Sequence, residues 1–236
     1  MRQRLAREWL DEDAGPEAEI RASLADLAWI HRRLGGAVAL ERLLASWRER
    51  AGRALPRRLD ILDVGAGAGA GTMAMLAWWR GQGHDARLVA LDRRASHLAA
   101  GRPWPPDVEL VAGDLFAPPF PPRSFDLVVC SLLLHHFHGP AAVEAVRRMT
   151  ELSRSGVVVH DLERSWLGYW GFRLIAAMRL SRMTRHDGRL SFRQAYTAPE
   201  LAALAARAGC GAFRVQAAGR FRLGLTIWRA GESNGA

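Results

Sequence analysis

Three aspartates in this chain join a reactive side chain to a position where parallel sheets bind ligands. Asp63 lies in the apolar run Ile-Leu-Asp-Val, which leads directly into the glycine-rich segment 65–71. Asp92 and Asp114 each follow another apolar run. A carboxylate accepts hydrogen bonds from hydroxyl and amino groups but repels a pyrophosphate. The three residues therefore indicate a ligand that offers hydrogen-bond donors or positive charge.

The glycines of segment 65–71 predict a tight turn between a strand and a helix. Glycine tolerates positive φ and lets the backbone approach a ligand, and the helix start offers free N–H groups. Gly65, Gly67 and Ala70 also satisfy the dinucleotide pattern G-x-G-x-x-G/A, with Asp92 at a suitable distance. An NAD(P)-binding oxidoreductase is therefore the alternative interpretation. A P-loop is disfavoured because no Gly-Lys-Ser/Thr follows.

Three histidines are candidates for a general base, because histidine titrates near neutral pH. His135 and His136 follow the fourth apolar run of the chain, and His160 lies near the end of the fifth. Packing or helix capping would explain each of them equally well. No metal site is expected at His135, His136 and His138, because their spacing matches no standard ligand pattern.

The elements that position these residues alternate between strands and helices from residue 59 onward. This alternation predicts βαβ units in a mostly parallel sheet, which binds ligands beyond the C-terminal ends of its strands. The last two strands, on either side of Gly219, predict an antiparallel pair. Strands are expected at 61–64, 87–92, 107–112, 125–133, 156–161, 211–217 and 221–229, and helices over much of 1–50 and at 95–100, 140–152 and 199–208.

The pattern of Asp63 and the three glycines that follow, acidic-x-Gly-x-Gly-x-Gly, resembles motif I of the class I S-adenosylmethionine-dependent methyltransferases. The run 113–129 resembles a pattern found in small-molecule methyltransferases related to the ubiquinone-pathway enzymes. The resemblance is good over residues 55–161 and loose outside them. It implies a Rossmann-like, seven-stranded sheet, a helical N-terminal segment, and S-adenosylmethionine as the cofactor.

The resemblance also implies roles for individual residues. Asp92 corresponds to the acid that accepts hydrogen bonds from the ribose hydroxyls, and Asp114 with Leu115 corresponds to the adenine contact. Asp63 and the glycine turn correspond to the part that holds the methionine moiety, and Arg93 is placed over the adenine edge. The expected cofactor-binding set is Asp63, Gly65, Ala66, Gly67, Gly69, Asp92, Arg93, Asp114, Leu115 and Ser131. His136, in the Leu-His-His ending shared with the family, and His160 are the expected bases.

Residues 162–195 form an insertion rich in aromatic and arginine residues. One interpretation is an amphipathic helix that covers the sheet, and another is a substrate lid. A third is docking on a membrane surface by a basic, aromatic helix. As a lid, the segment would contact the acceptor through Tyr169, Trp170, Arg182 and His186.

Composition bounds the remaining possibilities. The chain has 236 residues and a formal net charge of +9, but it contains no lysine, and its 33 arginines are spread along its length. This distribution indicates a compositional bias, so no specific nucleic-acid partner is expected. Cys130 and Cys210 lie in apolar runs and suit a reducing compartment, and no signal peptide or spanning run is evident, so a cytoplasmic location is expected.

These observations predict an N-terminal helical cap at 1–54, a methyltransferase domain at 55–230 with the insertion at 162–195, and a tail at 231–236. The expected reaction is methyl transfer to a small-molecule acceptor, with a hydroxyl of an aromatic or polyketide-like compound as the first choice. A carbon or nitrogen acceptor is the alternative. The acceptor's identity and the oligomeric state are left open.

Overall fold

The computed structural model describes residues 1–3, 5–51 and 55–229, in which seven strands form one sheet. The strand order is β3-β2-β1-β4-β5-β7-β6, and every pairing is parallel except those of β7 with β5 and β6. This confirms the predicted mostly parallel sheet with a C-terminal antiparallel pair. The strands are β1 (Arg58–Val64), β2 (Asp85–Asp92), β3 (Val108–Ala112), β4 (Phe125–Ser131), β5 (Ser153–Leu162), β6 (Ala212–Gly219) and β7 (Arg222–Trp228).

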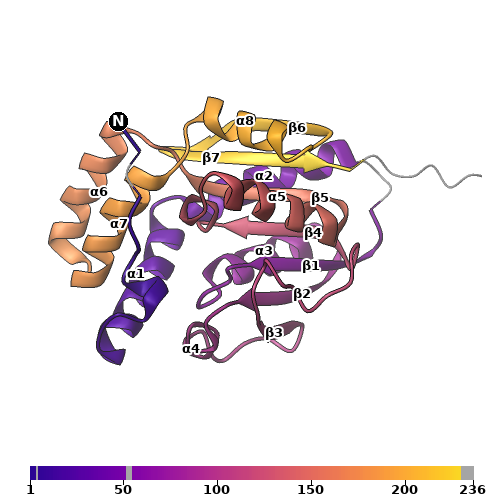
Figure 1. The fold of residues 1–236 in the computed structure, drawn as a ribbon. Helices are drawn as coiled ribbons and strands as arrows, with labels where there is room; N and C mark the ends of the chain where they lie inside the picture. The colour runs from indigo at the N-terminus through magenta and orange to yellow at the C-terminus, as the bar shows by residue number, and fades with distance from the viewer. Residues whose placement is uncertain (4, 52–54, 230–236) are drawn as a thin grey trace, which may run out of the picture.

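Helices cover both faces of the sheet (Figure 1). Helices α5 (Pro140–Leu152) and α8 (Ala198–Arg207) pack on one face, and Thr197 caps α8 in a capping box with Glu200. Helices α2 (Gly36–Ala51), α3 (Ala70–Gly81) and α4 (Ala95–Ala100) pack on the other. Strand side chains alternate between the two cores, as the period of two in a strand requires.

One predicted strand is too long at its C-terminal end. The fourth strand was expected at 125–133, but β4 ends at Ser131. Leu132 adopts a φ of 57°, and the 3-10 helix η3 (Leu134–His136) follows. The chain therefore leaves the sheet two residues early, and this brings His135 and His136 onto a short helix at the edge of the sheet.

The N-terminal segment divides into two parts. Helix α2 belongs to the core, because Trp47 is fully buried and its carbonyl accepts a hydrogen bond from Trp228 Nε1 at 3.1 Å. The 3-10 helix η1 (Leu10–Glu12) and helix α1 (Glu17–Arg33) precede it. Helix α1 lies against α7 (Arg182–Gln194) at the end of the sheet to which β4 points (Figure 1). The predicted tail 231–236, residue 230 and residues 52–54 lie outside the described residues.

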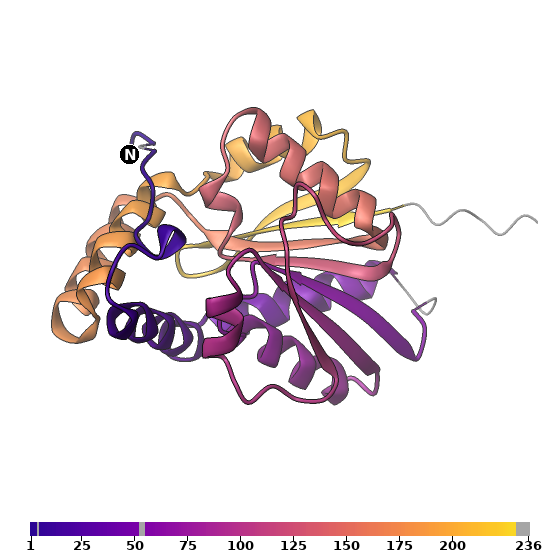
Figure 2. The same cartoon turned by 60° about the horizontal axis from the view of Figure 1, so that its bottom comes forward.

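The insertion folds into two helices, α6 (Trp166–Arg179) and α7 (Arg182–Gln194), which pack against each other. A single amphipathic helix was one of the expectations for this segment. Residues 182–194 form a second helix because the Ser181 side chain caps it by accepting from Thr184 N, and because Asp187, Ser191 and Gln194 are buried. Figures 1 and 2 both show the N-terminal segment running beside this helical pair. Within the described residues, no helix is both long and apolar enough to cross a membrane.

Candidate active site

A cavity of about 520 Å³ lies beyond the C-terminal ends of the parallel strands. One wall is the glycine turn, with residues 65–68, 70 and 71, together with Asp63, Asp92 and Ser131. The opposite walls come from α1, α6 and α7. They are largely apolar, with Leu24, Leu27, Ala28, Ile30, Leu34, Ile175, Phe172 and Phe192. The cavity therefore joins the predicted cofactor turn to the insertion.

The turn has the backbone that its glycines predict. Gly65, Gly67 and Gly69 have φ values of 74°, 54° and 84°, which only glycine adopts easily. A Cβ at Gly69 would also lie 2.2 Å from the Trp104 ring. Gly69 directly precedes the first residue of α3 and does not line the cavity, whereas Gly65, Ala66 and Gly67 do. Its role within the turn is therefore to shape the backbone that those three residues share.

Asp63 is almost completely buried at the base of the turn, where Thr72 Oγ1 donates to its Oδ2 at 2.5 Å. Burial, together with the nearby Asp92 charge, raises the pKa of Asp63 to about 7, although the Thr72 hydrogen bond opposes the rise. A carboxyl group so placed gains its charge most easily when a cation binds beside it. This matches a ligand that carries an ammonium or sulfonium group.

Asp92 lies in the cavity wall, where each carboxylate oxygen already accepts one backbone hydrogen bond. Gly67 N donates to Oδ2 and Arg94 N donates to Oδ1, both at 2.8 Å. Each oxygen retains a lone pair for a ligand. The carboxylate therefore ties the glycine turn to the end of β2 and can still accept from two hydroxyl groups.

Besides Gly69, three predicted cofactor residues lie outside the cavity wall: Arg93, Asp114 and Leu115. Asp114 is exposed and accepts a hydrogen bond from Phe116 N, while Leu115 is buried in the core. The Arg93 side chain is exposed. The loop after β3 thus does not contribute to this cavity, and the adenine contact at Asp114 and Leu115 stays a prediction.

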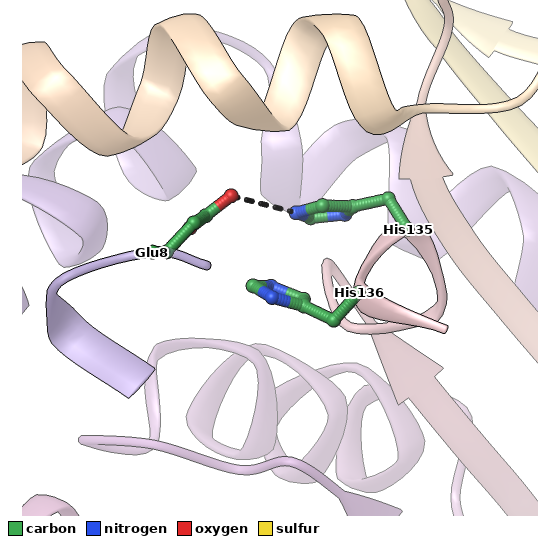
Figure 3. Close-up of side chains that lie close together, drawn as sticks. All are labelled: Glu8, His135 and His136. Carbon is green, nitrogen blue, oxygen red and sulfur yellow. Dashed lines mark ion pairs between the residues drawn. The ribbon is translucent and has the colours of Figure 1, made fainter. Parts of the chain in front are cut away.

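His135 lines the cavity and forms a histidine–aspartate pair with Asp161, which lies behind the cavity wall. Nδ1 of His135 lies 2.6 Å from Asp161 Oδ1, and the His135 backbone N–H donates to Oδ2 at 2.9 Å. Two contacts from one carboxylate fix the orientation of the imidazole and favour the tautomer with its proton on Nδ1. Nε2 is then the free acceptor, and it faces the Glu8 carboxylate at 3.8 Å (Figure 3).

His136 is in the cavity wall but pairs with a different acid. Its Nδ1 lies 2.7 Å from Asp11 Oδ2. Burial alone would favour the neutral ring, but the charges of Glu8 and Asp11 and the hydrogen bond to Asp11 outweigh it and raise the pKa of His136 to about 9. Near neutral pH this imidazole is a cation. It suits an electrostatic role better than the predicted role of general base.

The predicted base His160 is wrongly placed for catalysis. It is fully buried, it is absent from the cavity wall, and its Nδ1 pairs with Ser131 Oγ at 2.9 Å. Burial and the nearby charge of Arg222 lower the pKa of His160 to about 3. Successive strand residues point to opposite faces, so the side chain of Asp161, not that of His160, reaches His135.

Glu8 is a site residue that the sequence reasoning missed. Its carboxylate is buried and accepts hydrogen bonds from Ser191 Oγ at 2.7 Å and Gln194 Nε2 at 3.2 Å, and burial raises its pKa. Figure 3 shows it beside His135 and His136, and single ligand-type atoms of the three lie within 4.8 Å of one another. Since Asp161, Asp11 and α7 already pair with all three, the cluster is held together without a metal ion.

The insertion contributes to the cavity, but through residues other than those predicted. The lining positions are Gly168, Gly171, Phe172 and Ile175 of α6 and Thr184, Asp187, Gly188, Ser191 and Phe192 of α7. Of the predicted contacts, Tyr169 is buried elsewhere and Trp170 is 55% exposed. Arg182 lies over the ring of Trp9, and His186 stacks on the same ring at 3.8 Å. Helical periodicity turns these four away from the face that meets the cavity.

Comparison with known proteins relates the chain to methyltransferases. Residues 61–156 match a family model described as a methyltransferase domain. The chain is 31% identical over 122 residues to a demethylmenaquinone methyltransferase of Renibacterium salmoninarum, covering 52% of this chain and 48% of that protein. It is 32% identical over 127 residues to a malonyl-[acyl-carrier protein] O-methyltransferase of Halorhodospira halophila, covering 48% and 40%. The chain thus spans less than half the length of these curated relatives.

Solved structures share the fold over most of the chain. A SAM-dependent methyltransferase from Aquifex aeolicus aligns with a TM-score of 0.62 at 14% identity, covering 88% of this chain and 97% of that one. The plantazolicin methyltransferase BpumL, in complex with a monoazolic desmethylPZN analog and SAH, aligns with a TM-score of 0.66 at 13% identity, covering 91% of this chain and 96% of that one. At such identities the likeness concerns the fold alone.

Proposed function

We propose that this chain, which carries a class I S-adenosylmethionine-dependent methyltransferase domain, methylates a hydroxyl group of an apolar small molecule. One observation carries the proposal: a single cavity is lined both by the glycine turn with Asp63 and Asp92 and by His135, which pairs with Asp161 behind the wall. The first set suits the cofactor, and the second suits the removal of a proton from the acceptor. An aromatic or polyketide-like compound fits the apolar walls formed by α1, α6 and α7.

The residues present fit the cofactor. Asp63 is a buried acid whose charge a neighbouring ammonium or sulfonium would stabilise, and Asp92 retains acceptor capacity for two hydroxyl groups. The backbone of Gly65, Ala66 and Gly67 allows a close approach. When bound, S-adenosylmethionine supplies a methyl group activated by its positive sulfur. The tasks left to the chain are to align the acceptor and to accept its proton.

His135 is the residue to which we assign proton removal. Its Nε2 takes the proton of the acceptor hydroxyl, and the negative charge of Asp161 stabilises the resulting imidazolium. His136, held as a cation by Asp11, then lies beside the developing negative oxygen and stabilises it. The curated relatives are named as methyltransferases of demethylmenaquinone and of malonyl-[acyl-carrier protein], so quinone-like and malonyl acceptors are alternatives beside the predicted carbon or nitrogen acceptor.

The test is a methyl-transfer assay with labelled S-adenosylmethionine and a panel of phenolic, polyketide and quinone acceptors. We expect label in at least one phenol or polyketide hydroxyl, and loss of this transfer in His135→Ala. Calorimetric titration with S-adenosylhomocysteine and with NAD separates the oxidoreductase alternative, since only the former should bind. Binding of NAD alone would overturn the proposal.

Partner and location belong to the same proposal. We expect no specific nucleic-acid partner, so any binding to RNA or DNA should fall steeply with salt and show no sequence preference. Methyl incorporation into one nucleic acid at physiological salt would contradict this. Cys130 and Cys210 are both free, which suits the cytoplasmic location that we propose.

A further inference from the structure

Arg222 is a buried cation in the cavity wall. It is the first residue of β7, its exposed fraction is 5%, and within the described part of the chain its Nη1 has no hydrogen-bond partner. The nearest acid acting on it is Asp161, whose oxygens already accept from His135 and from Leu162 N. A buried guanidinium nitrogen without an acceptor is costly, so Nη1 calls for a partner that the described residues do not supply.

A second unpartnered donor lies close by. His31 of α1 is buried in the same wall, and its Nε2 has no partner within the described residues. Burial and the charge of Arg222 lower the pKa of His31 to about 4, so the ring is neutral and can donate from one nitrogen. His31 and Arg222 line the same cavity, and the His31 and His160 rings lie 6.3 Å apart, edge to face.

We propose that Arg222, assisted by His31, binds a carboxylate of the acceptor. This inference rests on the proposed function and narrows its substrate class to acidic compounds. The planar guanidinium matches the two oxygens of a carboxylate, and such charge-assisted bonds are among the strongest in proteins. Because Arg222 and His135 line one cavity, the carboxylate anchors the acceptor at one end while its hydroxyl meets His135.

The test compares 4-hydroxybenzoate with 4-hydroxybenzamide, which has the same shape without the charge. Calorimetry with the full chain should show binding of the acid and little binding of the amide. In Arg222→Met the affinity for the acid should fall about tenfold to 100-fold. Arg220→Met is the matched control, since Arg220 also lines the cavity but is exposed, and it should retain most of the affinity.

A stability measurement separates a binding role from a structural one. If Arg222 serves a ligand, Arg222→Met removes an uncompensated buried charge, and its urea midpoint should equal or exceed that of the natural chain. A clear fall in the midpoint would assign Arg222 a structural role and overturn the inference, as would equal binding of acid and amide. Neither measurement needs methyl transfer, so such a failure leaves the proposed reaction unaffected.

A different observation concerns the outer face of α6. Among the described residues, five of the eight exposed large hydrophobic side chains lie on this helix: Trp166, Leu167, Trp170, Leu174 and Met178, with exposed fractions of 53–77%. Spacings of four residues align most of them in one stripe. Helices α6 and α7 together contain six arginines and a single acid, Asp187, which is buried and bound to Trp9 N and Leu10 N.

We infer that this stripe docks on the surface of an anionic lipid bilayer. The apolar side chains would enter the interface, while arginines such as Arg173, which lies over Trp170 at 4.6 Å, would meet lipid phosphates. A second copy of the chain fits less well, because a symmetric contact would bring like charges together. The inner face of α6, with Phe172 and Ile175, lines the cavity, so docking would place the cavity beside the membrane.

Vesicle sedimentation tests the docking with the full chain. The protein should sediment with phosphatidylcholine vesicles that contain phosphatidylglycerol, much less with phosphatidylcholine alone, and less at high salt. Trp170→Ser with Leu174→Ser should reduce sedimentation, whereas Val38→Ser, an equally exposed apolar position on α2, should not. Absence of sedimentation would overturn the inference. So would self-association of the chain that the double substitution Trp170→Ser with Leu174→Ser abolishes and that vesicles do not affect.

Discussion

Asp161→Asn isolates the contribution of the charge next to His135. In the natural chain Asp161 Oδ1 meets His135 Nδ1 and Leu162 N–H, and Oδ2 meets the His135 backbone N–H. An asparagine has one oxygen and one NH2 group, so one of these donors must face another donor. If the oxygen takes the Oδ1 position, the tautomer of His135 is kept but the charge is lost. In the opposite orientation His135 carries its proton on Nε2 and cannot act as a base.

The magnitude follows from the distance. The Nδ1–Oδ1 separation of 2.6 Å places the two charge centres about 4 Å apart, where the attraction at an effective dielectric constant of about 20 is about 4 kcal/mol. Losing it from the transition state corresponds to a rate lower by about a thousandfold. The buried donor left unpaired costs about 1–3 kcal/mol of folding free energy. Asp161 is not in the cavity wall, so the cofactor affinity should be nearly unchanged.

The assay is single-turnover methyl transfer at saturating acceptor, together with titration of S-adenosylhomocysteine and a urea melt. His160→Asn is the control, because His160 neighbours Asp161 but is fully buried away from the cavity. This substitution should lower stability, and the methyl-transfer rate of the folded variant should stay within a few-fold of the rate of the natural chain. A rate for Asp161→Asn within tenfold of natural, or a larger loss in His160→Asn, would refute the assignment of His135 and Asp161.

Three further predictions address the cofactor turn, the insertion at 162–195, and the cluster of Glu8, His135 and His136. Asp63→Asn should stabilise the ligand-free protein by about 2–4 kcal/mol at pH 8 and little at pH 4. The reason is that the raised pKa of Asp63 makes the natural chain lose stability as the pH rises from 3.8 to about 7. Urea melts at both pH values check this, and the affinity for the cofactor should fall. Phe172→Ala should raise the acceptor KM and spare cofactor affinity, whereas Tyr169→Ala, which removes a buried ring outside the cavity, should mainly lower the urea midpoint. Removal of divalent metal with EDTA should leave methyl transfer unchanged; loss of activity restored by zinc would reassign Glu8, His135 and His136 as metal ligands.

The sequence by itself determined the architecture and one half of the site. Hydrophobic periodicity, turn chemistry and the alternation of strands and helices along the chain can be read locally. They were enough to predict the parallel sheet and its antiparallel pair. Asp63 and Asp92 were also predictable, because a parallel sheet brings the ends of neighbouring strands to one edge whatever the rest of the chain does. The place of Asp114 relative to the cavity was not predictable, since a long irregular connection has no such constraint.

Only the tertiary structure decided which residues meet at His135, in the part of the site to which we assign proton removal. His160 and Asp161 are adjacent in sequence, and which of them meets His135 depends on the face that each presents in β5. Glu8 and Asp11 lie more than 120 residues from the histidines that they contact, and no local pattern marks such a pairing. The insertion illustrates the same limit: its aromatic residues were recognised, but helix rotation, fixed by packing of α6 on α7, turned Phe172 toward the cavity and Trp170 toward solvent.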